Sequence, residues 1–195
     1  MNFFSQLFTP KKTVTNSLPP LFIIGLGNPG KKYANTRHNL GFLALEHLQQ
    51  SWSGSEWRLE KKFQAEISEA AYQGRKIVLV KPMTFMNHSG ASVQSLMSFY
   101  KATPAATIVL HDEVDIPFGS IKTTLSSRAA GHNGVKDIIE HLGTQDFRRV
   151  RLGVGKGNNP NISVSDHVLA PFTSDEQSKL STMFKESETL LKAWL

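Results

Sequence analysis

Hydrophobic residues along the chain fall into two alternating patterns. Short apolar runs that end at Gly or Pro are typical of buried strands, and apolar residues three or four positions apart are typical of amphipathic helices. The first pattern predicts strands over residues 21–27, 63–72, 76–82, 107–115, 119–127 and 148–156. The second predicts helices over residues 40–48, 91–100, 135–143 and 174–195. Strands that alternate with helices indicate an α/β layered fold.

Local signals refine several of these elements. Gly74 lies between two predicted strands and indicates that they pair around a turn. The run 119–127 alternates only weakly, which suits an edge strand. Gly143 is expected to end the third helix at its C′ position, and a Ser-x-x-Gln pattern beginning at Ser174 is expected to open the last one. Residues 27–39 and 157–163 are predicted loops.

The length of 195 residues suits one domain, and no apolar run approaches the roughly 20 residues of a membrane span. Cys is absent, which excludes disulfides, thiolate catalysis and Cys-based zinc sites. Residues 1–20 contain no acid and end in Pro-Pro, and we expect them to form a flexible extension. The remaining residues, 21–195, are predicted to form a single domain of a cytoplasmic protein.

The chain is basic, with a formal net charge of +6 and a pI of about 9.6. A basic surface favours a polyanionic partner such as a nucleic acid. The positive charge is concentrated between residues 120 and 156. This segment contains seven Lys and Arg residues and three Asp and Glu residues, which gives it a net charge of +4. After residue 156 the acids outnumber the bases.

A glycine-rich loop follows the first predicted strand. Residues 25–30, GLGNPG, match the G-x-G-x-x-G pattern of dinucleotide sites, a weak signal by itself. Pro29 removes one backbone donor, the next predicted helix begins only at Leu40, and Glu46, the acid nearest the expected spacing, lies inside that helix. We therefore expect no nucleotide cofactor and interpret the loop as a tight turn that presents Asn28. The alternative is that Asn28 only forms an Asx-turn.

Five polar residues stand where predicted strands end or helices begin: Asn28, His38, Asn87, Asp112 and Asn133. Each alone has an ordinary structural explanation as a helix cap or a strand end. Ligands of open α/β sheets bind beyond the carboxyl ends of the strands, so together these residues predict a shared cleft. Within the stretch NTRHNLG, residues 35–41, the neighbours of His38 are expected to hold the substrate.

The residue types in this set favour ester hydrolysis. The chain has no G-x-S-x-G or H-E-x-x-H motif, and His111 beside Asp112 lacks the remaining spacing of a metal site, so we expect no metal. An Asp bonded to one imidazole nitrogen fixes the tautomer, so the other nitrogen can deprotonate water. An Asn amide can stabilise the oxyanion that forms. Among the other histidines, His88, His132 and His167 could line a cleft but are assigned no chemistry.

Five segments, taken together, resemble the bacterial-type peptidyl-tRNA hydrolase family in order and spacing. They are GLGNPG, YANTRHNLG, PMTFMNHSG, HDEVDIPFG and the run from GHNGVKDIIEHLGT to RRVRLGVGK. The resemblance implies a single globular α/β domain with a twisted mixed sheet flanked by helices, a three-layer sandwich. It also implies a cytosolic monomer that needs no cofactor. Its activity would be hydrolysis of the ester between a peptide and the 3′ ribose of tRNA.

The resemblance also implies a role for individual residues. His38 would be the general base and Asp112 its partner. Asn28 would sense the blocked amino group of the last amino acid, and the rest of the substrate site would comprise Tyr33, Phe85, Met86, Asn87 and Asn133. Phosphates of the tRNA would meet Lys122, Arg128 and Arg151. One departure is Ala130, in a loop that is usually richer in glycine.

Two other functions stay open at this stage. The family fold also occurs in noncatalytic RNA-binding relatives that act in plastid intron splicing, but the retained His, Asp and three Asn positions argue against this function. A nucleotide-dependent enzyme is the second alternative, which titration with a dinucleotide would test.

Overall fold

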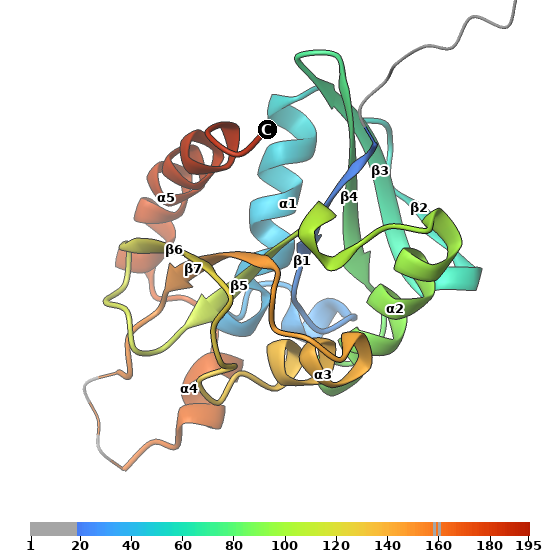
Figure 1. Cartoon of the computed structure of the whole chain (residues 1–195). Coiled ribbons are helices and arrows are strands. Elements are labelled where there is room, and N and C mark those ends of the chain that lie inside the picture. Colours follow the sequence, from blue (N-terminus) through green and yellow to red (C-terminus); the bar gives the residue numbers. More distant parts are fainter. Residues whose placement is uncertain (1–18, 158, 160) are drawn as a thin grey trace, which may run out of the picture.

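A computed structural model describes residues 19–157, 159 and 161–195, and these form one seven-stranded sheet with helices on both faces (Figure 1). The strand order is β2-β3-β4-β1-β5-β7-β6. The strands are β1 (Leu21–Gly25), β2 (Arg58–Glu60), β3 (Ala65–Tyr72), β4 (Arg75–Pro82), β5 (Thr107–Glu113), β6 (Ile121–Leu125) and β7 (Arg148–Gly153). The neighbours β4, β1, β5 and β7 run parallel, whereas β2, β3 and β6 pair antiparallel, so the sheet is mixed as predicted.

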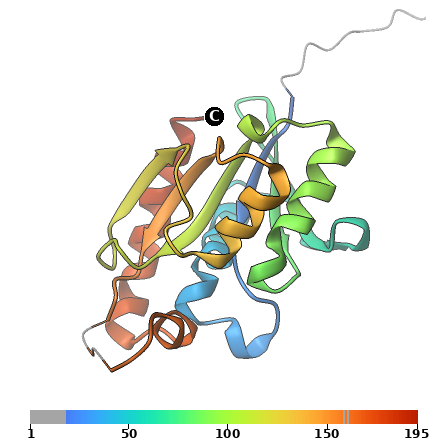
Figure 2. The ribbon, with the colours of Figure 1, turned by 60° about the horizontal axis from the view of Figure 1, so that its bottom comes forward.

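The helices divide between the two faces of this sheet. They are α1 (Leu40–Ser51), α2 (Ser89–Tyr100), α3 (Asn133–Leu142), α4 (Val164–Leu169) and α5 (Ser174–Lys192). Alternate residues of β1 show the division. Leu21 and Ile23 belong to the core under α1 and α5, and Phe22 and Ile24 to the core under α2 and α3. Figure 2 shows α2 and α3 side by side in front of the sheet with α5 behind it, which gives the three layers predicted for this fold.

Each predicted strand and helix is present, with its ends moved by a few residues. The turn at Gly74 joins β3 to β4, β6 lies at the sheet edge, and Gly143 ends α3 at a φ of 67°. The structure adds β2, α4 and several short 3-10 helices that the sequence patterns did not indicate. The capping residues predicted for the last helix were wrong by one position. The capping box is formed by Thr173 and Glu176, whereas the sequence pattern had indicated the pair one residue later. Of the extension predicted for residues 1–20, residues 1–18 lie outside the part of the chain that the structure describes.

Two glycines bring the start of α1 against the sheet. A Cβ atom on Gly25 would collide with the backbone of Gly41, and one on Gly41 would collide with the backbone of Leu26 and Leu110. Glycine is the residue that permits such a close approach. The final Gly of the NTRHNLG stretch therefore sets the depth at which the preceding residues, His38 among them, meet the end of β5.

Among the described residues, no helix combines the length and apolar character needed to cross a membrane.

Candidate active site

A cleft of about 760 Å³ opens beyond the carboxyl ends of β1 and β5, which are parallel neighbours in the sheet. Its lining comes from the loop after β1, the 3-10 helix Arg37–Asn39, the 3-10 helix Met86–His88, the end of β5 and the start of α3. The apolar residues Val164, Val168 and Leu169 of α4 contribute a wall. This is the sheet edge at which the sequence predicts a shared site.

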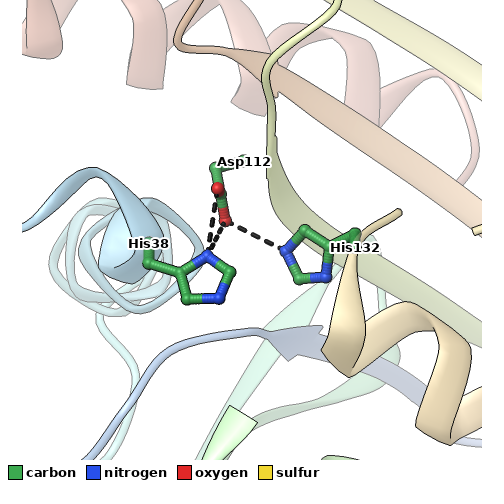
Figure 3. Close-up of side chains that lie close together, drawn as sticks. All are labelled: His38, Asp112 and His132. Atoms are coloured by element: carbon green, nitrogen blue, oxygen red, sulfur yellow. Dashed lines mark hydrogen bonds and ion pairs between the residues drawn. The ribbon is translucent and has the colours of Figure 1, made fainter. Parts of the chain in front are cut away.

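His38 and Asp112 are hydrogen-bonded in this cleft. The Nδ1 atom of His38 lies 3.0 Å from Asp112 Oδ1 and 3.1 Å from Oδ2. The carboxylate is buried at the end of β5, and the imidazole, 12 % exposed, lies at the entrance to α1 (Figure 3). Seventy-four positions separate the two residues in sequence, so the contact depends on the close approach of α1 to the sheet.

A second imidazole shares the same carboxylate. Nε2 of His132 lies 3.0 Å from Asp112 Oδ1, and the two histidine rings are 5.0 Å apart between centroids (Figure 3). The sequence patterns indicated no chemistry for His132. The available signal was its place shortly before the helix predicted over residues 135–143, where a side chain can cap the first turn.

Asp112 is held as an anion. Burial alone raises the pKa of a carboxyl, but in Asp112 the interactions with His132 and His38 outweigh it and lower the pKa well below the usual range. Because an ionised carboxylate only accepts hydrogen bonds, Nδ1 of His38 carries the hydrogen. The neutral His38 ring therefore has its lone pair on Nε2, which points away from Asp112 (Figure 3).

The ligand atoms of His38, Asp112 and His132 all lie within 4.8 Å of one another, a spacing that a metal ion could bridge. The hydrogen bonds argue for a different arrangement. Nδ1 of His132 accepts the backbone N–H of Val135 at 3.3 Å, so Nε2 of the neutral ring carries hydrogen and directs it at Asp112. Both imidazoles thus offer hydrogens, not lone pairs, to the carboxylate.

His111 lies outside this network, although it is adjacent to Asp112. Its ring is buried, and Nδ1 donates to the backbone carbonyl of Asp112 at 2.7 Å. Burial lowers the pKa of His111 well below its ordinary value. Nε2 of His111 has no partner among the described residues. The ring packs edge-on against His132, with 4.7 Å between centroids, and so supports the network by packing.

Asn28 presents a hydrogen-bond donor to the cleft. Its side-chain oxygen accepts the backbone N–H of Met86 at 2.8 Å, which fixes the orientation of the amide. Its Nδ2 has no partner in the described part of the chain, and the residue lines the cleft. Asn39 holds the loop from behind, because its side chain accepts from the backbone N–H of Asn28 at 2.8 Å and donates to its carbonyl at 2.9 Å.

The expectation that the neighbours of His38 hold the substrate is wrong for Arg37 and Asn39, since both are buried and engaged within the protein. Arg37 forms a bidentate pair with Glu176, at 3.0 Å and 2.6 Å. Its Nη1 donates to three carbonyls at the end of α4 and in the connection to α5, those of His167, Ala170 and Pro171. Arg37 therefore joins the segment that carries His38 to the start of α5.

Most of the other predicted substrate residues also line the cleft: Phe85, Met86, Asn87 and Asn133. Phe85 is 55 % exposed, so its ring is available for contact, whereas Met86 is buried. Tyr33 lies apart, since it does not line the cleft and the Lys32 ammonium lies 4.7 Å from its ring centroid. Ala130 lines the cleft at a φ of 48°, a left-handed conformation that favours glycine.

The predicted phosphate-binding residues lie beside the cleft, not in it. Lys122 and Arg151 are register partners on β6 and β7, so they stand side by side at the sheet edge. Arg151 donates to Glu113 at 2.9 Å and 3.1 Å, and Arg128 is exposed in the loop after β6. Arg149 does not belong to this basic surface, because its guanidinium is buried and bonded to carbonyls of the neighbouring loops.

Comparisons of the sequence with known proteins all identify the same family. A sequence model of the family described as Peptidyl-tRNA hydrolase matches residues 22–195. The peptidyl-tRNA hydrolase of Bacillus cereus (strain Q1) is 41 % identical over 173 residues, which cover 89 % of this chain and 91 % of that protein. The peptidyl-tRNA hydrolase of Exiguobacterium sibiricum is 45 % identical over 165 residues, covering 85 % and 88 %.

A solved structure extends this similarity to the fold. The crystal structure of peptidyl-tRNA hydrolase from Acinetobacter baumannii superposes with a TM-score of 0.79 at 36 % sequence identity. The match covers 88 % of this chain and 86 % of that one.

Proposed function

This chain belongs to the peptidyl-tRNA hydrolase family, and from that premise we propose how its cleft cleaves peptidyl-tRNA. The bond hydrolysed is the ester between the peptide and the 3′ ribose of the tRNA, and the reaction returns free tRNA after release from a stalled ribosome. The proposed chemistry uses side chains of the chain and a water molecule, and it needs no cofactor.

One observation carries the mechanism: His38 is bonded to a buried carboxylate through Nδ1 while its Nε2 points away from that carboxylate, in a ring that lines the cleft. Asp112 fixes the tautomer and stabilises the imidazolium that forms when Nε2 takes a proton. General-base help of this kind accelerates a reaction by about 10²–10⁴-fold. That range suits an ester more than an amide, whose leaving group is poorer.

The reaction then has two steps. Nε2 of His38 takes a proton from water as the water oxygen bonds to the ester carbonyl carbon, and an oxyanion forms. The carbon–oxygen bond to the ribose breaks as the carbonyl re-forms, and the proton on Nε2 passes to the departing 3′ oxygen. An amide N–H aimed at the oxyanion contributes about 10²–10³-fold, and three asparagines line the cleft: Asn28, Asn87 and Asn133.

Asn28 suits the recognition of a blocked amino group. Since its oxygen is occupied by Met86, the group that it offers the substrate is the N–H donor Nδ2. A donor pairs with the carbonyl oxygen of an acylated amine and has no favourable contact with a free ammonium. Asn28 therefore selects peptidyl-tRNA over aminoacyl-tRNA.

The surrounding residues supply binding. We assign the peptide backbone and the CCA end to Asn87 and Asn133, with the exposed ring of Phe85 available to stack on the terminal adenine and Met86 packed beside it. Tyr33 would act only at the outer margin of the substrate. Lys122, Arg128 and Arg151 would meet phosphates, which makes binding dependent on salt.

The wider setting follows from the substrate. We place the protein in the cytoplasm, where translation produces peptidyl-tRNA, and propose that it acts as a monomer. Residues 21–195 would be the catalytic domain.

The direct test compares hydrolysis of N-acetylaminoacyl-tRNA with that of the same unblocked aminoacyl-tRNA. The full chain is expected to cleave the blocked substrate and spare the free one, and Asn28→Ala should reduce this preference. No release of tRNA from the blocked substrate would contradict the function. An unchanged preference in Asn28→Ala would contradict the role of that side chain.

A matched variant tests for a covalent intermediate. Ser165 lines the cleft but has no hydrogen bond to His38, so it is not activated as a nucleophile. Ser165→Ala is therefore expected to keep the wild-type rate. Loss of activity in that variant would favour an acyl-enzyme over direct attack by water.

A further inference from the structure

His132 is the buried member of the cleft whose role is still unexplained. Its ring is about nine-tenths buried and bonded at both nitrogens, to Asp112 Oδ1 through Nε2 and to the backbone N–H of Val135 through Nδ1. It is the N-cap residue of α3, and Asn133, directly after it, lines the cleft. One side chain thus joins the start of a helix to the carboxylate behind the base.

The backbone of α3 fixes the protonation state of this ring. An N–H group at a helix start needs an acceptor, so Nδ1 of His132 must keep its lone pair. The hydrogen is then on Nε2, directed at Asp112. A doubly protonated ring would leave the Val135 N–H without its acceptor. His132 is therefore a neutral donor with a fixed direction.

This donor determines how Asp112 meets His38. Oδ1 accepts from both imidazoles at 3.0 Å, while Oδ2 accepts from His38 at 3.1 Å. A carboxylate held by one histidine alone could rotate about its Cβ–Cγ bond. The second bond from His132 holds the carboxylate plane facing His38, and the edge-on packing of His111 keeps the His132 ring in place.

We propose that His132 is a positioning residue for hydrolysis: its Nε2–H orients the Asp112 carboxylate behind His38, and its Nδ1 caps α3 and so places Asn133. This inference rests on the proposed function, because it assigns His38 as the base. His132 itself need not touch the substrate.

Because Nε2 of His132 binds Asp112 and Nδ1 caps α3, two substitutions can remove these interactions one at a time. In His132→Asn the side-chain oxygen occupies the place of Nδ1, so the cap on Val135 is kept and the bond to Asp112 is lost. In His132→Gln the longer amide reaches the place of Nε2, so the bond to Asp112 is kept and the cap is lost.

The experiment measures kcat and KM on N-acetylaminoacyl-tRNA together with thermal unfolding for both variants. We expect His132→Asn to unfold like the wild type while kcat falls about 10–100-fold, the usual effect of losing such a supporting partner, with KM little changed. His132→Gln is expected to lose thermal stability and keep most of its kcat. A wild-type kcat in His132→Asn, or an equal loss of kcat in both variants, would overturn the proposal.

A measurement on the wild-type protein keeps the test independent of any variant. The ¹⁵N chemical shifts of the His132 ring are expected to report a neutral imidazole with hydrogen on Nε2 at pH 7. Hydrogen on Nδ1, or a charged ring, would overturn the proposal. An inactive wild type would instead refute the proposed function and would leave this assignment of the tautomer to be decided by the spectra.

Discussion

Two carboxylates in this chain each bind a histidine ring at 3.0 Å, Asp112 with His38 and Glu188 with His47. The second pair lies between α1 and α5, where Ser51 completes the three side-chain types of a serine hydrolase. Its hydroxyl, however, donates to Glu188 at 2.9 Å and 3.0 Å, not to the histidine. His47, Ser51 and Glu188 all lie outside the lining of the cleft.

The two carboxylates differ in what surrounds them. Burial raises the pKa of Glu188, but hydrogen bonds outweigh it and lower the pKa to about 2. The donors come from α5, from α1 and from the residue that follows α1: Lys192, Trp52, Ser51 and His47. Glu188 thus uses its oxygens to fasten α5 to α1. Among the described residues, the donors to the Asp112 side chain are two imidazoles, and one of these, His38, has its second nitrogen directed away from the carboxylate (Figure 3). In the proposed mechanism, the capacity for catalysis depends on that free imidazole nitrogen beside the cleft, and residue types alone do not supply it.

The largest expected effect separates the two carboxylates by activity. Asp112→Asn places an amide N–H beside Nδ1 of His38, which forces the hydrogen to Nε2 and removes the lone pair that the proposed general base needs. We expect kcat to fall about 10³–10⁴-fold, as in other enzymes whose orienting Asp is replaced by Asn. Glu188→Gln should leave kcat unchanged. The rates of both variants are measured in single-turnover hydrolysis of N-acetylaminoacyl-tRNA. Equal losses of rate in the two variants would show that the two carboxylates do not differ in their role in catalysis.

Replacement of Arg37 is expected to have an intermediate effect, on stability and not on catalysis. Arg37 is next to His38 in sequence, but like Glu188 it holds two segments of the fold together. Arg37→Lys loses the bidentate pair with Glu176 and most of the carbonyl contacts. We expect the free energy of unfolding in urea to fall by about 1–3 kcal/mol, the cost of leaving buried groups unpaired. The affinity for tRNA and its dependence on salt should not change. A weaker salt dependence would return Arg37 to the substrate-binding role predicted from the sequence.

The smallest effect concerns the stability contributed by Glu188 and its pH dependence. Because its pKa is lowered on folding, from 4.5 to about 2, ionised Glu188 stabilises the folded state above pH 4.5, and this contribution is lost as the pH falls towards 2. Glu188→Gln keeps one acceptor oxygen and should therefore be less stable than the wild type at pH 7 by only about 0.5–1.5 kcal/mol, the net contribution of a typical hydrogen bond. The difference should shrink below pH 4.5. Urea unfolding at several pH values measures it, and a difference that stays constant with pH would contradict this account.

The elements predicted from sequence are those whose pattern is local. The repeats of apolar residues in β1, β5 and α1 reveal buried faces, and the turn at Gly74 is marked by one residue. The sequence patterns did not indicate β2 and α4, since three and six residues are too few for a period to show.

The candidate site was predictable to the extent that its residues end strands or begin helices, as Asn28 and Asp112 do. The role of Arg37 was not, because its partners lie about 130 to 139 positions later in the chain. His132 was missed for a similar reason. Its contact with Asp112 depends on the course of a loop that passes through Ala130 at positive φ, and no spacing in the sequence reports that course.

The most direct test of the central claim is the single-turnover hydrolysis of N-acetylaminoacyl-tRNA by His38→Ala and His47→Ala, measured side by side with tRNA binding. We predict that His38→Ala loses about 10²–10⁴-fold in rate while still binding tRNA, and that His47→Ala, where folded, keeps the wild-type rate. A wild-type rate in His38→Ala, or an equal loss in a folded His47→Ala, would contradict it.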